Sequence, residues 1–220
     1  MESKMAVILC YGDSNTHGTK PVAIGQCAAR YARGIPWTDV MGAKLGQDHF
    51  VIVEGLPGRT TVHDDPIDGG VRSGIAVLPA ILRSHEPLDL LVLMLGTNDL
   101  KQRFSSSSLE IAKSVDRIVK EARWHIPALD ILIVSPTSIS LTDVTADMFA
   151  GADSRQIELT LHLERVAQMN ETDFLSADNH VKVSPIDGVH WDQKSHRTFG
   201  NIMAVAVLAR LAERGLLNCK

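Results

Sequence analysis

The chain is 220 residues long, of which 45% are hydrophobic and 22% are charged. This length suits a single domain over residues 1–220, because it is enough to bury a core without disulfides or a structural metal. The net charge of −4 comes with no basic run of the kind that neutralises nucleic-acid phosphates or binds anionic membranes. We therefore expect neither a nucleic-acid partner nor a membrane partner.

The cysteines and the first residues indicate a cytoplasmic protein. Cys10, Cys27 and Cys219 are odd in number and lack the Cys-x-x-Cys or Cys/His spacing of a zinc site, which favours free thiols in a reducing compartment. The apolar run 6–11 is too short for the hydrophobic region of a signal peptide or for a membrane span.

Five short apolar runs predict buried parallel strands, because their residues are apolar on both faces. They cover residues 6–11, 49–54, 88–95, 129–135 and, more weakly, 174–178. Between them, helical spacing occurs at Trp37, Val40, Met41 and Leu45, at 109–119 after a Ser107-x-x-Glu110 capping box, at 157–169, and at 199–211 before Gly215. The alternation predicts an α/β fold, a three-layer α/β/α sandwich whose five-stranded parallel sheet has the flavodoxin-like order 2-1-3-4-5.

Polar motifs follow three of these strands. They are Gly12-Asp13-Ser14-Asn15, the block Gly55-Leu56-Pro57-Gly58-Arg59-Thr60 and Gly96-Thr97-Asn98-Asp99. A fourth motif, Asp187-Gly188-Val189-His190, precedes the last helix. Because ligands of open α/β sheets bind beyond the carboxyl ends of the strands, we expect all four motifs to meet in one crevice.

The residue types in these motifs are those of serine acyl transfer. A serine hydroxyl needs an imidazole to accept its proton and a carboxylate to orient that imidazole, roles that Ser14, His190 and Asp187 can fill. The developing oxyanion needs fixed donors, and the N–H groups of Ser14 and Gly58 with the Asn98 carboxamide can supply them. Gly55 is the alternative to Gly58.

Taken in order, these four motifs resemble the four blocks of the GDSL/SGNH hydrolase family over nearly the whole chain. The stretches 8–14, 54–61 and 92–99 are most similar to bacterial arylesterases that also show acyltransferase or perhydrolase activity. Glu54 stands where many members of the family have asparagine, and His17 and Thr19 stand where that subgroup tends to have tryptophans. The resemblance implies a serine esterase that needs no cofactor, acts on a small-molecule ester and forms a closed homo-oligomer.

Several other interpretations of these residues are open. His63, Asp64, Asp65 and Asp68 invite a metal site, but a solvated turn is the better account of a loop that also bears Gly and Pro. Arg59 can bind a substrate anion or tie down its own loop. Asp13 and Asp99 are interpreted as organisers of their turns.

Other functions also remain in view. A carbohydrate acetylesterase or a thioesterase/lysophospholipase would use the same fold. Outside the hydrolases, Gly18-Thr19-Lys20 suggests a phosphate-binding module, although the order Gly-x-x-x-x-Gly-Lys-Ser/Thr is broken, and Asp13 suggests a receiver-like module.

Two long connections, 19–37 and 136–153, carry apolar side chains that a solvated loop would not need. We expect them to wall the pocket or to meet a neighbouring subunit. A pocket narrowed in this way should favour small or short-chain acyl groups.

Overall fold

The computed structural model describes residues 5–215. Within this range five strands form one parallel sheet in the order β2-β1-β3-β4-β5, which confirms the predicted topology. The strands are β1 (Ala6–Gly12), β2 (His49–Gly55), β3 (Leu90–Met94), β4 (Asp130–Ser135) and β5 (Asp173–Ser176). The strand order reverses between β1 and β3, because β2 lies on one side of β1 and all later strands lie on the other. The carboxyl ends of β1 and β3 flank this point.

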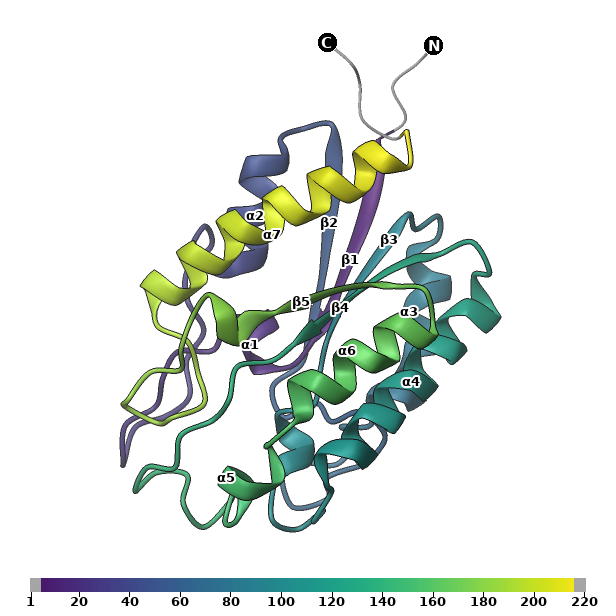
Figure 1. Ribbon diagram of the computed structural model, residues 1–220. Coiled ribbons are helices and arrows are strands. Elements are labelled where there is room, and N and C mark those ends of the chain that lie inside the picture. The colour runs from purple at the N-terminus through teal and green to yellow at the C-terminus, as the bar shows by residue number, and fades with distance from the viewer. Residues whose placement is uncertain (1–4, 216–220) are drawn as a thin grey trace.

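Helices cover both faces of the sheet (Figure 1). One face carries α2 (Trp37–Leu45) and α7 (Gln193–Glu213), and the other carries α3 (Gly74–His85), α4 (Ser108–His125) and α6 (Leu159–Met169). Short turns of helix lie at the strand ends and in the connections: α1 (Ser14–His17), η1 (Asn98–Leu100), α5 (Ala152–Arg155) and η2 (Ala177–Asn179). The result is the expected three-layer sandwich.

Two hydrophobic cores follow from the alternation of side chains along each strand. In β1, Ile8 and Cys10 pack with Trp37 of α2, whereas Leu9 and Tyr11 point to the opposite core. The central strands β3 and β4 are buried at every position, but the edge strands β2 and β5 are mostly half-buried. The expectation of burial on both faces is therefore wrong for β2 and β5, because an edge strand has a neighbour on one side only.

Helix boundaries follow local capping chemistry. The capping box at Ser107 and Glu110 is present and starts α4, as predicted. Helix α7 begins at Gln193, earlier than its apolar spacing indicated, because the Asp192 side chain accepts the Ser195 N–H and caps it. Helix α3 was not anticipated, since Gly74 and Pro79 are poor helix formers and its face is buried by tertiary packing.

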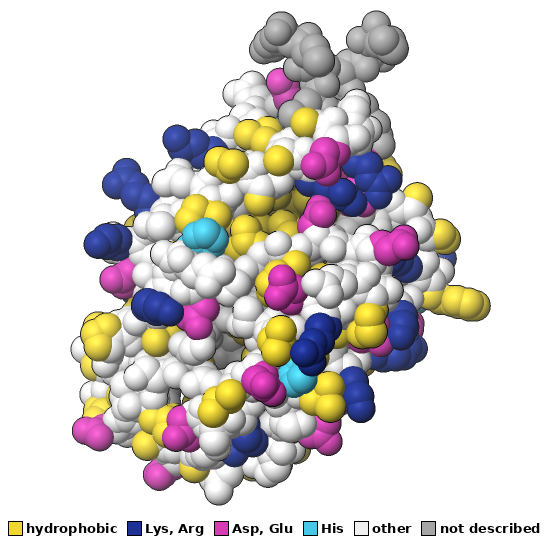
Figure 2. Space-filling view, in the orientation of Figure 1, with side chains coloured by type: hydrophobic (Ala, Val, Ile, Leu, Met, Phe, Trp, Pro, Cys, Tyr) yellow, Lys and Arg dark blue, Asp and Glu magenta, His cyan; other side chains and the backbone are white. Residues whose placement is uncertain are grey.

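The described surface carries mixed charge. Figure 2 shows acidic and basic side chains interspersed over one face rather than gathered by sign. Cys10 is buried and Cys27 is exposed, both as free thiols, while Cys219 lies outside the described residues. Across residues 5–215, the helices are too short or too polar for any of them to traverse a lipid bilayer.

Candidate active site

Ser14 is the first residue of α1, and only Asp13 separates it from the end of β1. The Asp13 side chain caps this short helix by accepting the Asn15 N–H at 3.0 Å. The turn is tight: a Cβ on Gly55 would lie 2.2 Å from the His17 nitrogen, so only glycine lets the end of β2 approach α1 this closely. The first backbone N–H groups of a helix have no partner within the helix. Ser14 therefore presents both its hydroxyl and its backbone N–H at the end of the strand.

Asp187 and His190 are joined directly. The His190 Nδ1 lies 2.6 Å from Asp187 Oδ2, and His190 N–H donates to Asp187 Oδ1 at 2.9 Å. An ionised carboxylate can only accept, so the imidazole proton belongs on Nδ1 and the lone pair on Nε2. That tautomer is the one that can accept a proton from a nucleophile.

The Asp187 carboxylate is held by further donors. The N–H of Val189 donates to Oδ1 at 3.0 Å, and the N–H of Val22, from the connection 19–37, donates to Oδ2 at 2.8 Å. Burial alone would raise the pKa of Asp187, but the hydrogen bonds and the charge of His190 outweigh it and lower the pKa to about 2. Asp187 is therefore ionised throughout the neutral range.

Asn15 links the serine turn to the histidine loop. Its Nδ2 donates to the Val189 carbonyl at 3.1 Å, and its Oδ1 accepts the Trp191 N–H at 3.0 Å. Asn15 thus binds the backbone on both sides of His190. Sequence reasoning assigned Asn15 no role of its own, and only its place beside Ser14 pointed to it.

Asn98 and Gly58 come from the loops after β3 and β2. The Asn98 Nδ2 donates one of its two N–H groups to the carbonyl of Arg59 at 3.0 Å, which fixes which end of the amide faces the cavity. Gly58 has φ +79°, a left-handed conformation that favours glycine. Gly58 lines the same cavity as Ser14, whereas Gly55 faces α1.

Arg59 ties its loop down, which settles the choice left open by the sequence. Its guanidinium donates to the carbonyl oxygens of Gly12 and Glu54, and it lies over the Tyr11 ring at 4.1 Å. Glu54 pairs with His85, its Oε1 lying 3.0 Å from His85 Nε2. Arg59 is itself 3% exposed, so it holds the strand ends together rather than facing solvent.

Asp99 organises the β2 loop, as the sequence indicated. Its carboxylate accepts the N–H and the hydroxyl of Thr61. Burial raises the pKa of Asp99 to about 7, and the bonds from Thr61 oppose that shift.

A cavity of about 250 Å³ joins these groups. Ser14, Gly58, Asn98, Asp187 and His190 all line it. Part of its wall comes from the two long connections, through Thr19, Val22 and Ala28 and through Val144, Thr145, Met148 and Phe149. The expectation that these connections wall the pocket is confirmed.

The acidic loop after β2 differs from the solvated turn that was expected. Asp65 is fully buried, and its carboxylate binds Lys101 Nζ at 2.9 Å and Arg103 Nη1 at 2.7 Å. Asp68 binds Lys101 Nζ at 2.5 Å. The loop therefore closes on cations of the chain itself, because two basic side chains that follow η1 reach across to it. The spacing within 63–68 contains no sign of these partners.

Comparisons with known proteins agree with this fold. The chain resembles solved structures of an inhibitor-bound aryl esterase from M. smegmatis (32% identity, TM-score 0.88, covering 93% of this chain and 99% of that one) and of Est24, a carbohydrate acetylesterase from Sinorhizobium meliloti (34%, 0.87, 93% and 99%). A carbohydrate acetylesterase family member from the same organism is 36% identical, with a TM-score of 0.87 and coverage of 94% and 100%.

A comparison with curated proteins gives no match. The model of the GDSL-like Lipase/Acylhydrolase family matches residues 10–197, a span that begins in β1 and ends in α7 and so includes every residue of the cavity discussed above. Given this match and the esterase structures that share the fold, the chain is an esterase that belongs to the GDSL-like lipase/acylhydrolase family.

Proposed function

We propose that the protein is a serine carboxylic ester hydrolase in which Ser14 is the nucleophile, His190 the general base and Asp187 the residue that orients it. The observation that carries this proposal is the Asp187–His190 contact of 2.6 Å in a cavity that Ser14 also lines. His190 takes the hydroxyl proton as Ser14 Oγ attacks the carbonyl carbon. It then gives that proton to the leaving alcohol, and water resolves the acyl-enzyme.

The proposed oxyanion hole consists of the Ser14 N–H, the Gly58 N–H and one N–H of Asn98. Support comes from the position of all three around one cavity and from the Arg59 carbonyl, which holds the other Asn98 N–H. Fixed donors of this kind stabilise the tetrahedral intermediate without reorganisation at the moment of reaction.

The proposed substrates are small or short-acyl esters, with an aryl or a carbohydrate alcohol part. A cavity of about 250 Å³ is below the roughly 300–1,000 Å³ of most drug-sized sites, which argues against a long acyl chain and so against a lysophospholipase or long-chain thioesterase. The solved aryl esterase and carbohydrate acetylesterases support both alcohol classes.

We extend the proposal to acyl transfer and to a homo-oligomer. An apolar cavity wall made of Val22, Val144 and Phe149 would let an alcohol or peroxide compete with water for the acyl-enzyme. Ile24, Ile67 and Ile186 are more than half exposed, on the connection 19–37 and on loops that also contribute to the cavity, so a second subunit could cover them. Light scattering after gel filtration measures the assembly, and ester formation from added alcohol measures transfer.

Active-site labelling tests the mechanism most directly. A fluorophosphonate should modify Ser14 and no other serine in the wild-type protein, and peptide mapping identifies the site. The variant Ser14→Ala should lose the label, whereas Ser84→Ala, an exposed serine in α3, should keep it. Label on a different serine, with aryl acetate hydrolysis intact in Ser14→Ala, would contradict the proposal.

A further inference from the structure

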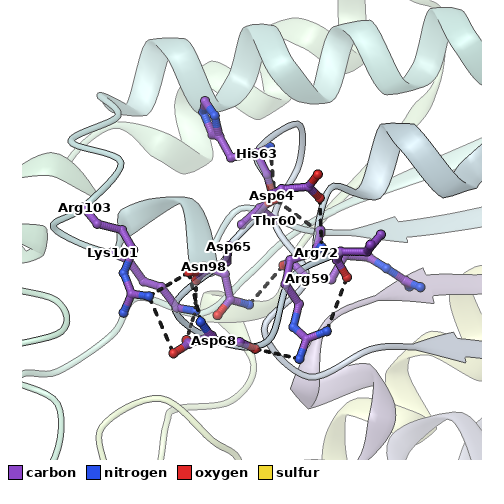
Figure 3. Close-up of polar contacts among 11 residues, drawn as sticks. Arg59, Thr60, His63, Asp64, Asp65, Asp68, Arg72, Asn98, Lys101 and Arg103 are labelled. Carbon is purple, nitrogen blue, oxygen red and sulfur yellow. Dashed lines mark hydrogen bonds and ion pairs between the residues drawn. The ribbon is translucent and has the colours of Figure 1, made fainter.

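A buried ion-pair network lies beside the proposed oxyanion hole. Figure 3 shows Lys101 and Arg103 reaching the carboxylates of Asp65 and Asp68, with Asn98 next to them. The side chains of Lys101 and Asp65 are 2% and 0% exposed, while that of Asp68 is 31% exposed. The proposed catalytic steps use none of these four groups.

Two members of the network line the cavity. Lys101 and Asp68 are in its wall together with Ser14, Gly58 and Asn98, and the rest of the wall toward the long connections is largely apolar. The Lys101 Nζ lies only 3.9 Å from the point where a Cβ on Gly58 would stand. A polar pair is therefore built into the cavity close to where the ester group would bind.

The network has donor and acceptor capacity left for a ligand. An ammonium carries three N–H groups, and within the described residues Lys101 spends two of them, on Asp65 and Asp68. Asp68 gives Oδ2 to Lys101, and among residues 5–215 its Oδ1 has only Arg103, at 3.5 Å. One donor and one acceptor thus lie side by side.

The charge balance decides which ligand fits. Two cations, Lys101 and Arg103, face two carboxylates, Asp65 and Asp68, so these ion pairs are neutral together, and the neighbouring Arg72 guanidinium donates to the Asp68 backbone carbonyl at 2.8 Å. An anionic or cationic substrate gains little from a neutral pair. A hydroxyl group both donates and accepts, so it can bond to Asp68 and to Lys101 at once.

We propose that Asp68 and Lys101 form a specificity subsite that binds a hydroxyl group near the scissile ester, so that the preferred substrates are short-acyl esters of hydroxylated compounds. This inference rests on the proposed function, because it takes the cavity beside Ser14 as the substrate site. The hydroxyl can belong to the alcohol part, as in an acetylated sugar, or to the acyl part, as in a hydroxy acid.

Matched substrate pairs test the subsite. Methyl 6-O-acetylglucoside is compared with cyclohexylmethyl acetate for the alcohol part, and ethyl lactate with ethyl propionate for the acyl part. The pair whose kcat/KM ratio favours the hydroxylated ester shows which part of the substrate reaches the subsite. We expect Asp68→Asn to lower that ratio by about 10-fold or more, mainly through KM, because a hydrogen bond to a charged group is lost.

The variant Asp116→Asn is the matched control. Asp116 also pairs with a lysine, Lys120 at 2.6 Å, but it lies in α4 and does not line the cavity. It should leave both ratios as in the wild type. A ratio in Asp68→Asn within about threefold of the wild-type value would overturn the subsite, as would a wild-type preference for the deoxygenated ester in both pairs.

A binding measurement separates this proposal from the proposed function. Because it uses the wild-type protein, it also tests the subsite if a variant folds poorly. Hydrolysis of phenyl acetate tests the mechanism alone: it should be present in the wild type and lost in Ser14→Ala. A wild-type protein that does not hydrolyse phenyl acetate would count against the mechanism and not against the subsite. Calorimetric titration of the wild type reports the subsite without turnover, with methyl glucoside against cyclohexylmethanol for the alcohol part and lactamide against propionamide for the acyl part. Tighter binding of the hydroxylated member of either pair supports the subsite, and tighter binding of the deoxygenated member in both pairs contradicts it.

Discussion

The carboxamide of Asn15 is bonded to the backbone on both sides of His190. It donates to the carbonyl of the preceding residue, Val189, at 3.1 Å and accepts the N–H of the following residue, Trp191, at 3.0 Å. Asn15 is also the neighbour of Ser14 in α1. One buried side chain therefore fixes the distance between the proposed nucleophile and the proposed base, which lie far apart in the sequence.

We expect Asn15→Ala to lower kcat by roughly 10- to 100-fold with a smaller change in KM, because a misplacement of about 1 Å is enough for such losses. Its rate of fluorophosphonate labelling should fall in parallel. Asn201→Ala, at an exposed site on α7, is the control. If Asn15→Ala lost thermal stability while kcat stayed within about threefold, Asn15 would be a structural residue only.

Ser14→Ala and His190→Ala should each remove activity toward phenyl acetate by several orders of magnitude, and the double variant should lose little more, since such residues act as a unit. Steady-state kinetics of the three variants measure this. Independent, additive losses would argue against a shared proton-transfer step.

Asn98→Ala should lower kcat by about 10²–10³-fold, with KM less affected, because its free N–H would act mainly in the transition state. The second N–H is held by the Arg59 carbonyl, so Asn98→Asp, which has no N–H to give, should be at least as impaired. An effect of Asn98→Ala on KM alone would remove Asn98 from the oxyanion hole.

The sheet order and most elements were predictable because parallel strands buried between helices leave a strong apolar pattern. The capping box before α4 was also predictable, because it is a local signal that two residues three positions apart provide. The existence of α3 was not, since its buried face is stabilised by contacts made only in the folded chain, and the start of α7 was missed because its Asp192 cap lies before the apolar positions of the helix.

The predicted site residues Ser14, Gly58, Asn98, Asp187 and His190 do line one cavity, because each follows a strand or precedes the last helix. The long-range contacts around these residues could not be predicted from the sequence. Val22 N–H bonds to Asp187 across 165 positions, and Lys101 reaches Asp65 across 36. Nothing in the spacing of either segment records such a contact.

Chain-length preference tests the cavity wall. Acetyl to butyryl aryl esters should be cleaved far better than octanoyl esters. Met148→Ala shortens a side chain at the wall and should raise the octanoyl-to-butyryl ratio of kcat/KM by about threefold or more. Met169→Ala, at a methionine 72% exposed on α6, should leave the ratio unchanged. A wild-type preference for octanoyl esters would contradict the narrow pocket.

His196 couples the stability of the fold to acid. It is completely buried, its ring contacts those of Tyr31 and Trp191, and its Nδ1 accepts the Trp37 N–H at 3.2 Å. A protonated imidazole has no acceptor, so charging His196 would break that bond as well as bury a cation. Burial lowers the pKa of His196 from 6.5 to about 4.

The sign of the effect follows from proton counts. Between pH 6.5 and pH 4 the unfolded chain binds a proton at position 196 and the folded chain does not, so the free energy of unfolding falls as the pH falls. The contribution is complete above pH 6.5, and about 3 kcal/mol is lost by pH 4.

His196→Asn keeps an acceptor near Nδ1 but cannot titrate. Urea denaturation at several pH values should therefore show a variant that is less stable at pH 7 but whose deficit shrinks toward pH 4. The same substitution at the exposed His180 should leave the pH profile as in the wild type, and a deficit in His196→Asn that stays constant from pH 7 to pH 4 would show that this histidine does not link the fold to acid.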